Sequence, residues 1–437
     1  MNLKDHPTVK SFLAQSSPAD ATSQSRQPLD ADWLRQLCID CGADDAGLVE
    51  IERPALDDQR DVILKCFPRA RTLLSFVCLM NRGPIRSPAR SVANLEFHAS
   101  YDQANEVARQ VVTKLESMGI QAMNPSVGFP MEMDNFPGRL WVVSHKPVAV
   151  EAGLGRIGIH RNVIHPRFGN FIVLGTILLD AEATAYDRPI EYNPCLECKL
   201  CVAACPVGAI SPNGDFQFSS CMTHNYREFM SGFSDWVESV ASSNTALSYR
   251  EKVTLSETAS MWQSLSFGPN YKAAYCLAVC PAGEDVIGPF LTDRKTYLDE
   301  TLRPLTEKGE TLYVISGSDA EAHAAKRFPN KKTKRVTSGI RPTSISGFLF
   351  GLKLLFQPGQ AAKLSAIYHF TFTGEDAQQA TVQIDQGKLQ VHTGHVGQTW
   401  LGFLAKERSL LWALLRRKIR IQGSPKLLIA FGKCFPA

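Results

Sequence analysis

The sequence predicts three folded parts: an N-terminal α/β domain, a cysteine-rich metal-binding module and a C-terminal α+β domain. Helix-like and strand-like apolar patterns alternate up to residue 185. Seven of the twelve cysteines then fall between positions 195 and 280. In the last part, apolar and polar residues alternate as they do in half-buried strands. A chain of 437 residues has room for about two to four domains.

The N-terminal α/β domain is predicted over residues 31–185. Its expected elements are a helix over Asp32–Cys41, a buried strand over Thr72–Leu79, an amphipathic helix over Tyr101–Met118 and a strand over Phe171–Leu179. Residues 1–30 are polar and lack the apolar core of a signal peptide, so we predict a disordered tail and a cytoplasmic protein.

Composition excludes some classes of function. No apolar run of 18 residues appears, so no transmembrane segment is expected. A hydrophobic content of 44% and a charged content of 21% are ordinary for a globular protein. The net charge of +4 is too small to indicate a nucleic-acid partner, and none is expected.

The cysteines carry the strongest chemical signal. The run from Cys195 to Pro206 has the spacing C-x2-C-x2-C-x3-C-P, with thiols at 195, 198, 201 and 205. This is the spacing of bacterial ferredoxins, in which the fourth cysteine binds a different cluster from the first three. A zinc site is the alternative, but zinc prefers C-x2-C pairs separated by a loop.

A second, shorter motif runs from Cys276 to Pro281 and makes residues 186–300 a ferredoxin-like module with two 4Fe-4S clusters. The crossed pattern gives the first cluster the ligands Cys195, Cys198, Cys201 and Cys280. The second cluster is left with Cys205, Cys221 and Cys276. A complete second motif would have a further cysteine where Ala273 stands. The second cluster is therefore a three-iron cluster, or a four-iron cluster with a ligand other than cysteine.

Residues 301–343 are predicted to connect this module to the C-terminal domain over 344–437. The connection begins with a strand from Thr311 and ends in a basic stretch, Lys326–Arg335. Alternation in the C-terminal domain predicts antiparallel strands, then a helix over Glu407–Leu415 and a strand over Ile419–Ile421. One sheet face is expected to carry Tyr368, Phe370, Phe372, Val382, Ile384, Leu389 and Val391.

A glycine-rich segment upstream of the cysteines suggests a family. Glu151-Ala-Gly-Leu-Gly155-Arg-Ile-Gly158 is followed by Pro166-Arg-Phe-Gly169 and then the cysteine run. This order resembles the epoxyqueuosine reductase and reductive dehalogenase superfamily over roughly residues 30–290. The resemblance implies a base-off cobalamin between the α/β domain and the module, and makes Gly153, Gly155 and Gly158 cofactor-binding candidates. Glycines let a backbone approach a flat cofactor closely, although a tight structural turn needs them equally.

The proton donor expected from the resemblance is missing. Epoxyqueuosine reductases carry an aspartate in a D-x-x-P-V-x-E segment, and the matching positions here are Val127 or Ser144. Neither is an acid, which argues against epoxyqueuosine as the substrate. Nearby groups that could donate a proton, or that are simply solvated surface residues, are Glu132, Asp134, His145 and Lys146.

The C-terminal domain resembles sterol-carrier-protein-2-type lipid-binding domains. The similarity rests on Tyr368–Gly374, Val382–Val391 and Lys418–Gly423. It implies a lipid or another apolar ligand.

Together these features predict an enzyme, an iron–sulfur oxidoreductase that passes electrons to a bound cofactor and so reduces an unidentified, apolar substrate. The electron donor would be a reduced ferredoxin or flavodoxin. The alternative is a non-catalytic electron-transfer protein without cobalamin.

Overall fold

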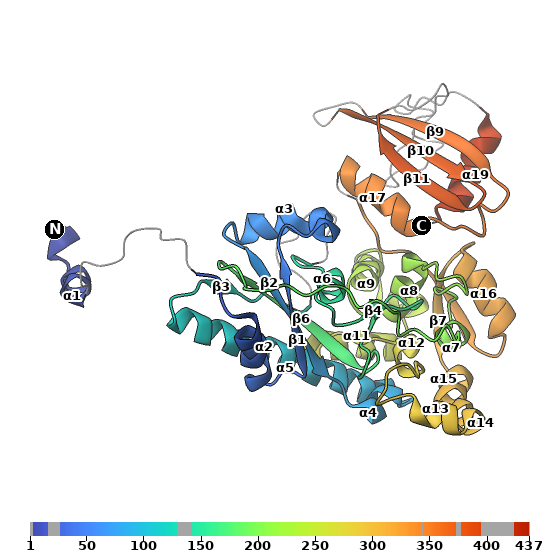
Figure 1. Ribbon diagram of the computed structural model, residues 1–437. Helices are drawn as coiled ribbons and strands as arrows, with labels where there is room; N and C mark the ends of the chain where they lie inside the picture. The colour runs from blue at the N-terminus through green and yellow to red at the C-terminus, as the bar shows by residue number, and fades with distance from the viewer. Residues whose placement is uncertain are drawn as a thin grey trace.

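The computed structural model describes residues 3–15, 27–128, 141–342, 344–372, 377–394 and 424–436. Figure 1 shows a larger body that holds the N-terminal sheet and the cysteine-rich helices, with the C-terminal sheet above it. Helix α1 stands apart from both. No helix in the described ranges combines the length and the apolar character needed to cross a bilayer.

The N-terminal tail contains a helix that the sequence did not predict. A 3-10 turn, η1 (Leu3–Asp5), precedes α1 (Pro7–Gln15), and residues 7–14 of this helix are not buried. Pro7 takes the first helical position, where its missing N–H leaves no hydrogen bond unmade. The structure thus describes a helix within this tail, and disorder in residues 1–30 stays a prediction.

A four-stranded sheet forms the centre of the N-terminal part, in the order β1-β2-β6-β3. Its strands are β1 (Asp45–Glu50), β2 (Thr72–Leu79), β3 (Ala122–Met123) and β6 (Ile172–Leu179). Helices and strands alternate along the chain as predicted, but every pairing in this sheet is antiparallel rather than parallel. β2 and β6 are mostly apolar and almost wholly buried, because helices cover both faces of the sheet.

Two separate cores lie on the two faces of this sheet. On one face, α2 (Ala31–Asp40) and α5 (Arg90–Ser117) pack against Leu74 and Phe76. On the other, α3 (Asp57–Cys66) and α6 (His145–Glu151) pack against Leu73. Three short elements complete this part: η2 (Pro54–Leu56), α4 (Arg82–Arg86) and the hairpin of β4 (Arg156–Ile157) and β5 (Val163–Ile164).

The cysteine-rich module is helical. Its cysteine-bearing helices are α7 (Leu200–Ala204), α8 (Phe218–Asn225) and α12 (Tyr275–Ala278). Between α8 and α12 lie α9 (Ser231–Ala241), α10 (Ala246–Lys252) and α11 (Leu255–Phe267). After α12 follow α13 (Gly288–Thr292), α14 (Arg294–Tyr297), the π-helical turn η3 (Leu298–Leu302) and α15 (Arg303–Glu307).

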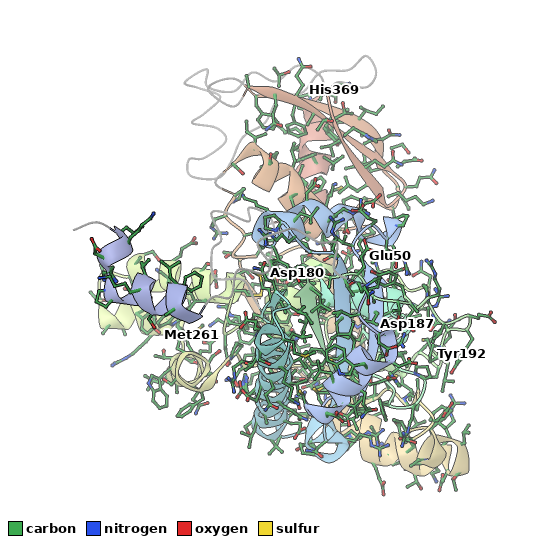
Figure 2. All side chains as sticks on the ribbon, turned by 60° about the vertical axis from the view of Figure 1, so that its left-hand side comes forward. Glu50, Asp180, Asp187, Tyr192, Met261 and His369 are labelled. Atoms are coloured by element: carbon green, nitrogen blue, oxygen red, sulfur yellow. The ribbon has the colours of Figure 1, made fainter. Side chains whose placement is uncertain are left out.

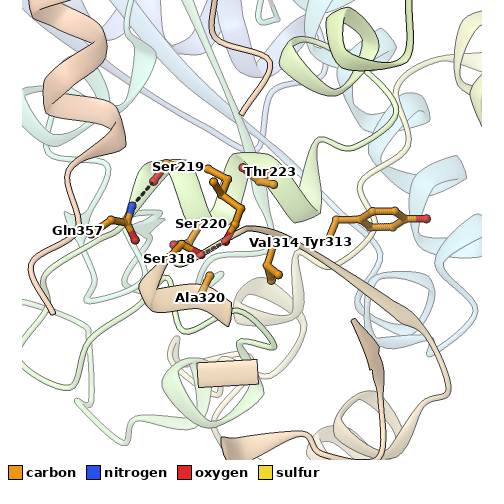
Figure 3. Close-up of a pocket in the computed structure, with 9 residues that line it drawn as sticks. Ser219, Ser220, Thr223, Tyr313, Val314, Ser318, Ala320 and Gln357 are labelled. Carbon is orange, nitrogen blue, oxygen red and sulfur yellow. Dashed lines mark hydrogen bonds between the residues drawn. The ribbon is translucent and has the colours of Figure 1, made fainter. Parts of the chain in front are cut away.

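Residues 301–343, predicted as a connection, contain a small folded unit. Strands β7 (Thr311–Ile315) and β8 (Lys332–Val336) pair in parallel, joined by α16 (Asp319–Arg327). Figure 3 shows where this unit meets α8: Thr223 faces Val314 and Ala320, and no space is left for a water molecule. The unit is thus part of the body.

The C-terminal domain contains a three-stranded antiparallel sheet in the order β11-β10-β9. Its described elements are α17 (Ile345–Leu355), β9 (Ser365–Phe372), β10 (Gln378–Asp385), β11 (Lys388–Thr393) and α19 (Pro425–Cys434). The predicted helix over 407–415 and strand over 419–421 lie outside the described residues. The predicted apolar face is confirmed, since Tyr368, Phe370 and Val382 are buried on it.

Candidate iron–sulfur and cofactor site

The first cysteine run wraps into a tight loop ahead of α7. Glu197 and Lys199, which lie between the first three cysteines, have φ values of 49° and 61°. Non-glycine residues seldom adopt this left-handed conformation, so the surrounding structure must hold them there. The chain is thus sharply bent between the first three cysteines.

Four thiols gather beside this loop. Burial raises the pKa of Cys201, and the neighbouring thiols of Cys276, Cys280, Cys198 and Cys195 raise it further. The pKa of Cys280 is raised to about 12, again by burial first and then by Cys198 and Cys195. The residues that follow α12 thus bring Cys280 close to the first run.

The remaining three thiols form a second group. Burial raises the pKa of Cys221 well above its usual range, and Cys276 and Cys205 add to the shift. The pKa of Cys276 is raised to about 11 by burial and then by Cys205. These thiols come from α8, α12 and the end of α7. The two groups are adjacent, because Cys276 also acts on Cys201.

Backbone amides point at the sulfur of Cys205. The N–H of Ala209 donates to Cys205 Sγ over 3.2 Å. Burial raises the pKa of this thiol, whereas the N–H groups of residues 207 to 210 lower it. Gly208 makes this turn with φ of 62°. A ring of N–H donors of this kind stabilises a thiolate that binds a cluster.

The position of the missing cysteine is buried and fixed. Asn225 Oδ1 accepts hydrogen bonds from the N–H groups of Ala273, over 2.8 Å, and Ala274, over 3.0 Å. Ala274 has φ of 46°, so the loop turns here much as it does in the first run. Asn225 was not among the predicted site residues, because nothing in the sequence connects it to a position 48 residues away.

Within the described ranges, no three His, Cys, Asp or Glu side chains lie close enough to hold one metal ion. The ligands of a single zinc ion stand within about 4 Å of one another. In a four-iron cluster, by contrast, each thiolate binds a different iron. The thiol groups are therefore not preformed sites for a single ion.

The three predicted cofactor-binding glycines contact the protein's own chain. A Cβ atom on Gly155 would lie 2.3 Å from Ile164 O, and one on Gly153 would lie 2.9 Å from Arg188 O. At Gly158 it would lie 2.6 Å from Ile164 Cδ1. Gly155 also has φ of 152°. The tight turn thus explains all three glycines, and their contact with a cofactor stays a prediction.

A buried ion-pair network fixes the start of this turn. Arg53 donates to Glu50 over 2.6 Å and to Glu151 over 2.8 Å, and it also donates to Asp187 O. Burial alone would raise the pKa of Glu50, but the hydrogen bond from Arg53, a backbone hydrogen bond and the charges of Arg53 and Arg188 together lower it. Glu50 and Asp187 lie side by side on one flank of the sheet (Figure 2). Arg53 ties β1 to the C-terminal end of α6.

Lys146 reaches from α6 toward the second thiol group. Its Nζ donates to Arg161 O over 2.9 Å and to Asn162 Oδ1 over 3.0 Å. Burial lowers the pKa of Lys146, whereas the nearby Cys276 and Cys221 act to raise it. The side chain nevertheless keeps solvent-accessible surface. The Lys146 ammonium group therefore lies beside the second thiol group at the protein surface.

Three tyrosines line the same region. Tyr101, Tyr226 and Tyr271 are each half-buried, and burial raises the pKa of each. Tyr226 and Tyr271 stand edge to face with centroids 5.7 Å apart, and Tyr226 lies near Cys221. Sequence reasoning missed these aromatic rings because they come from three distant segments.

The other proton-donor candidates are placed less favourably. His145 is held at both ring nitrogens, by Thr176 Oγ1 at 2.9 Å and by Ser126 O at 3.0 Å. Burial lowers its pKa to about 4, so the ring is neutral at pH 7. Glu132 and Asp134 lie outside the described residues.

Part of the chain is similar in sequence to one group of enzymes. No protein-family model matches. The epoxyqueuosine reductase of Aliivibrio fischeri is 26% identical over 133 residues, which is 30% of this chain and 34% of that protein. The enzyme of Synechococcus is 35% identical over 114 residues, 26% of this chain and 33% of that protein. The chain thus spans about a third of the length of the curated relatives it matches.

Solved structures give weaker matches. A catabolic reductive dehalogenase, NpRdhA, has a TM-score of 0.39 at 17% identity, covering 72% of this chain and 38% of its own. An epoxyqueuosine reductase bound to a tRNA stem loop has a TM-score of 0.37 at 15% identity, covering 75% of this chain and 85% of its own. These scores add nothing to the sequence matches. Those matches, over about 30% of the chain, support a relationship to the epoxyqueuosine reductase superfamily.

Proposed function

We propose that this protein is an iron–sulfur oxidoreductase that passes electrons through two clusters to a base-off cobalamin and reduces a substrate not yet identified. The observation that carries the proposal is the gathering of the seven thiols in one region, where they act on one another's pKa values. Their assignment as four and three follows the crossed ligand pattern of two-cluster ferredoxin modules. The clusters supply one-electron carriers when bound.

In this proposal the first cluster is bound by Cys195, Cys198, Cys201 and Cys280. The second is bound by Cys205, Cys221 and Cys276. A thiol must lose its proton to bind iron. Because burial raises the pKa values of these thiols, they stay protonated near pH 7 when no iron is bound. The N–H donors around Cys205 favour the thiolate. Ala273 leaves one position of the second cluster without a cysteine.

The region around Lys146 and the three tyrosines, beside the second thiol group, is the proposed cofactor site. Tyr101, Tyr226 and Tyr271 offer aromatic surface to a flat ring, and Lys146 borders the same space. The hairpin that follows Gly155 supplies the backbone beside Lys146. Bound there, cobalamin would supply a cobalt ion that accepts electrons and delivers them to a substrate.

Lys146 is the proposed proton donor. It is the one sequence-predicted candidate within the described ranges whose pKa responds to the thiols of Cys276 and Cys221. A lysine with a lowered pKa gives up its proton more readily at neutral pH than an ordinary lysine. Because Val127 and Ser144 are not acids, we propose a substrate other than epoxyqueuosine. A reduced ferredoxin or flavodoxin in the cytoplasm is the proposed electron source.

A second proposal concerns the C-terminal domain, which we infer binds an apolar ligand. Most of its inner sheet face is closed by α17 and α19, with Phe370 and Phe431 centroids 5.7 Å apart. Leu389 and Val391 on β11 are, however, only half-buried. An apolar ligand would cover them.

The main proposal is tested on anaerobically purified full-length protein produced with cobalamin available. We expect about seven to eight irons per chain, matching acid-labile sulfide, and cobalamin bands beside the broad iron–sulfur absorption. Cys198→Ala should lose one cluster. Tightly bound zinc without sulfide would overturn the iron–sulfur assignment. If the protein has its full iron content but takes up no cobalamin, the alternative of a non-catalytic electron-transfer protein holds instead.

Lys146 is tested by a matched pair of variants. Lys146→Met should keep both clusters and the cofactor but lose most reductive turnover, assayed with cobalamin and a chemical reductant. Lys353→Met, an exposed lysine on α17, should behave as wild type. Equal turnover in both variants would remove Lys146 as the proton donor.

A further inference from the structure

Two arginines from one short segment of the N-terminal part reach into the cysteine-rich module. Arg86 ends α4, and Arg90 begins α5. α4 packs against α12, the helix that carries Cys276 and is followed by Cys280. The segment 86–90 therefore brings two guanidinium groups to the part of the module that contributes to both thiol groups.

Arg90 lies at the N-terminal end of α12, beside the second thiol group. Its guanidinium stacks on the ring of Tyr275, with Cζ 5.4 Å from the ring centroid. Tyr275 directly precedes Cys276 in the chain. Burial lowers the pKa of Arg90, and the charge of Cys276 is among those that raise it. The guanidinium and the Cys276 thiol are thus close enough to influence each other.

Arg86 lies at the other end of α12, beside the first thiol group. Its Nε donates to Ala278 O over 3.3 Å, and its Nη2 donates to Tyr297 Oη over 3.2 Å. Tyr297 in turn donates to Val279 O, next to Cys280. Burial raises the pKa of Tyr297 to about 12, and the thiol of Cys280 adds to the shift. Each arginine is therefore linked to one thiol group through one tyrosine.

The charge of Arg90 has no carboxylate partner in the described part of the chain. The residue is 7% exposed, and its Nη1 donates only to the carbonyl oxygens of Ile85 and Ser87. Glu310, a carboxylate whose charge acts on Arg90, is already paired with Lys331 at 2.5 Å. Arginine stays protonated in proteins, and a buried charge without a counter-charge is costly. The second thiol group supplies that counter-charge once its thiols bind iron as thiolates.

We propose that Arg90 is the counter-ion of the second cluster and Arg86 that of the first, and that each arginine raises the reduction potential of its own cluster. The inference rests on the proposed function, because it requires both clusters. One electron from the reduced ferredoxin or flavodoxin adds one negative charge to a cluster, and a fixed cation nearby stabilises that reduced form.

The two arginines differ in burial, so their effects should differ in size. Arg90 is buried, whereas Arg86 is half-buried and closer to solvent. A charge acts more strongly through the protein interior than through water, so Arg90 should have the larger effect. This difference favours an electron on the second cluster, which lies beside the proposed cofactor site.

The test is a redox titration of the anaerobic full-length protein, followed by EPR. Cys276→Ser should lack the second cluster and so assigns the two reduction steps. Arg90→Gln should make the reduction of the second cluster at least tenfold less favourable, a fall of about 59 mV for one electron, and leave the first cluster unchanged. Arg86→Gln should lower the potential of the first cluster, by a smaller amount, and leave the second unchanged.

Two control variants separate the charge of the arginine from its packing. Arg90→Lys keeps the positive charge and should restore most of the wild-type potential. Arg109→Gln removes an exposed arginine of the same helix, α5, that pairs with Glu106, and it should titrate as wild type. A potential as low in Arg90→Lys as in Arg90→Gln would overturn the assignment to charge.

Iron and sulfide analysis of every variant keeps the result decisive. Arg90 is buried, so Arg86→Gln serves alone if Arg90→Gln does not hold its clusters. Intact clusters with unchanged potentials in these glutamine variants would overturn this inference and leave the proposed function standing. A wild type without iron and sulfide would overturn the proposed function and this inference with it.

Discussion

At the scale of single residues, burial holds several ionisable groups in their neutral forms. Burial lowers the pKa of His145, His160 and His224 to about 4. His224 is fully buried, and its Nδ1 accepts a hydrogen bond from Tyr313 N over 3.3 Å. Such a ring stabilises the fold only while it is uncharged.

The fold should therefore lose stability as the pH falls below about 6.5. The unfolded chain binds a proton at His224 near pH 6.5, whereas the folded chain does so only near pH 4. Between these values the unfolded state holds more protons, so the unfolding free energy falls with pH. His224→Asn keeps an acceptor near Nδ1 but does not titrate. Between pH 7.5 and 5 its urea unfolding free energy should fall by about 2 kcal/mol less than that of wild type.

His145 and His160 titrate in both proteins, so the difference isolates His224. An equal fall in wild type and variant would mean that His224 is already charged, or already solvated, in the folded state.

A glycine prediction belongs to the same scale. Gly155→Ala should strain the backbone by about 1–3 kcal/mol and push Ile164 away, because φ is positive and the new Cβ meets Ile164 O at 2.3 Å. We expect a lower thermal midpoint and a disturbed hairpin. Gly83→Ala is the control, since nothing lies within 4 Å of its Cβ position. If Gly155→Ala melts like wild type but loses cobalamin, the glycine serves the cofactor instead of the turn.

At the scale of elements, the loop before α12 repeats the geometry of the loop before α7. Both contain left-handed non-glycine residues, Ala274 in one and Lys199 in the other. The loop before α12 differs in having Ala273 at the position of a thiol. Asn225 holds its backbone through two N–H groups, so a side chain at 273 has a fixed direction.

Ala273→Cys should therefore complete the second cluster. For the wild type we expect the EPR signal of an oxidised three-iron cluster after brief exposure to air, and loss of that signal in Cys276→Ser. Ala273→Cys should instead keep a four-iron cluster under the same exposure. Two equally air-resistant four-iron clusters in the wild type would reveal a fourth ligand other than cysteine.

Local patterns predicted the elements that depend on neighbours in sequence. The strand over Thr72–Leu79 and the alternation on β9 follow from apolar periodicity alone. α5 begins at Arg90, eleven residues before the predicted Tyr101, because its first turns carry polar residues such as Asn94 among the buried ones. Antiparallel pairing and the link from Arg53 to Glu151 depend on contacts across many residues, which no local pattern encodes.

At the scale of the whole molecule, Gln357 joins the C-terminal domain to the body. Its side chain is fully buried and accepts a hydrogen bond from Asp319 N over 2.9 Å. It also donates to Ser219 Oγ, at 3.4 Å (Figure 3). Its backbone N–H donates to Cys434 O over 2.9 Å. The C-terminal domain is thus anchored, and its ligand binding is best measured in the full chain.

The last prediction concerns the inner face of that domain. Val391 on β11 lies opposite Val382 on β10, which is fully buried, yet Val391 is only half-buried. An apolar ligand that covers Val391 would gain about 25 cal/mol per Å² of buried surface, before ordering costs. Val391→Trp should occupy that space and reduce the uptake of a fluorescent fatty-acyl probe, with little change in stability. Gln390→Trp places the same ring on the exposed opposite face and should bind the probe as wild type does. If the face is instead a solid core, Val391→Trp overpacks it and lowers the unfolding free energy by about 1–3 kcal/mol, and the wild type takes up no probe.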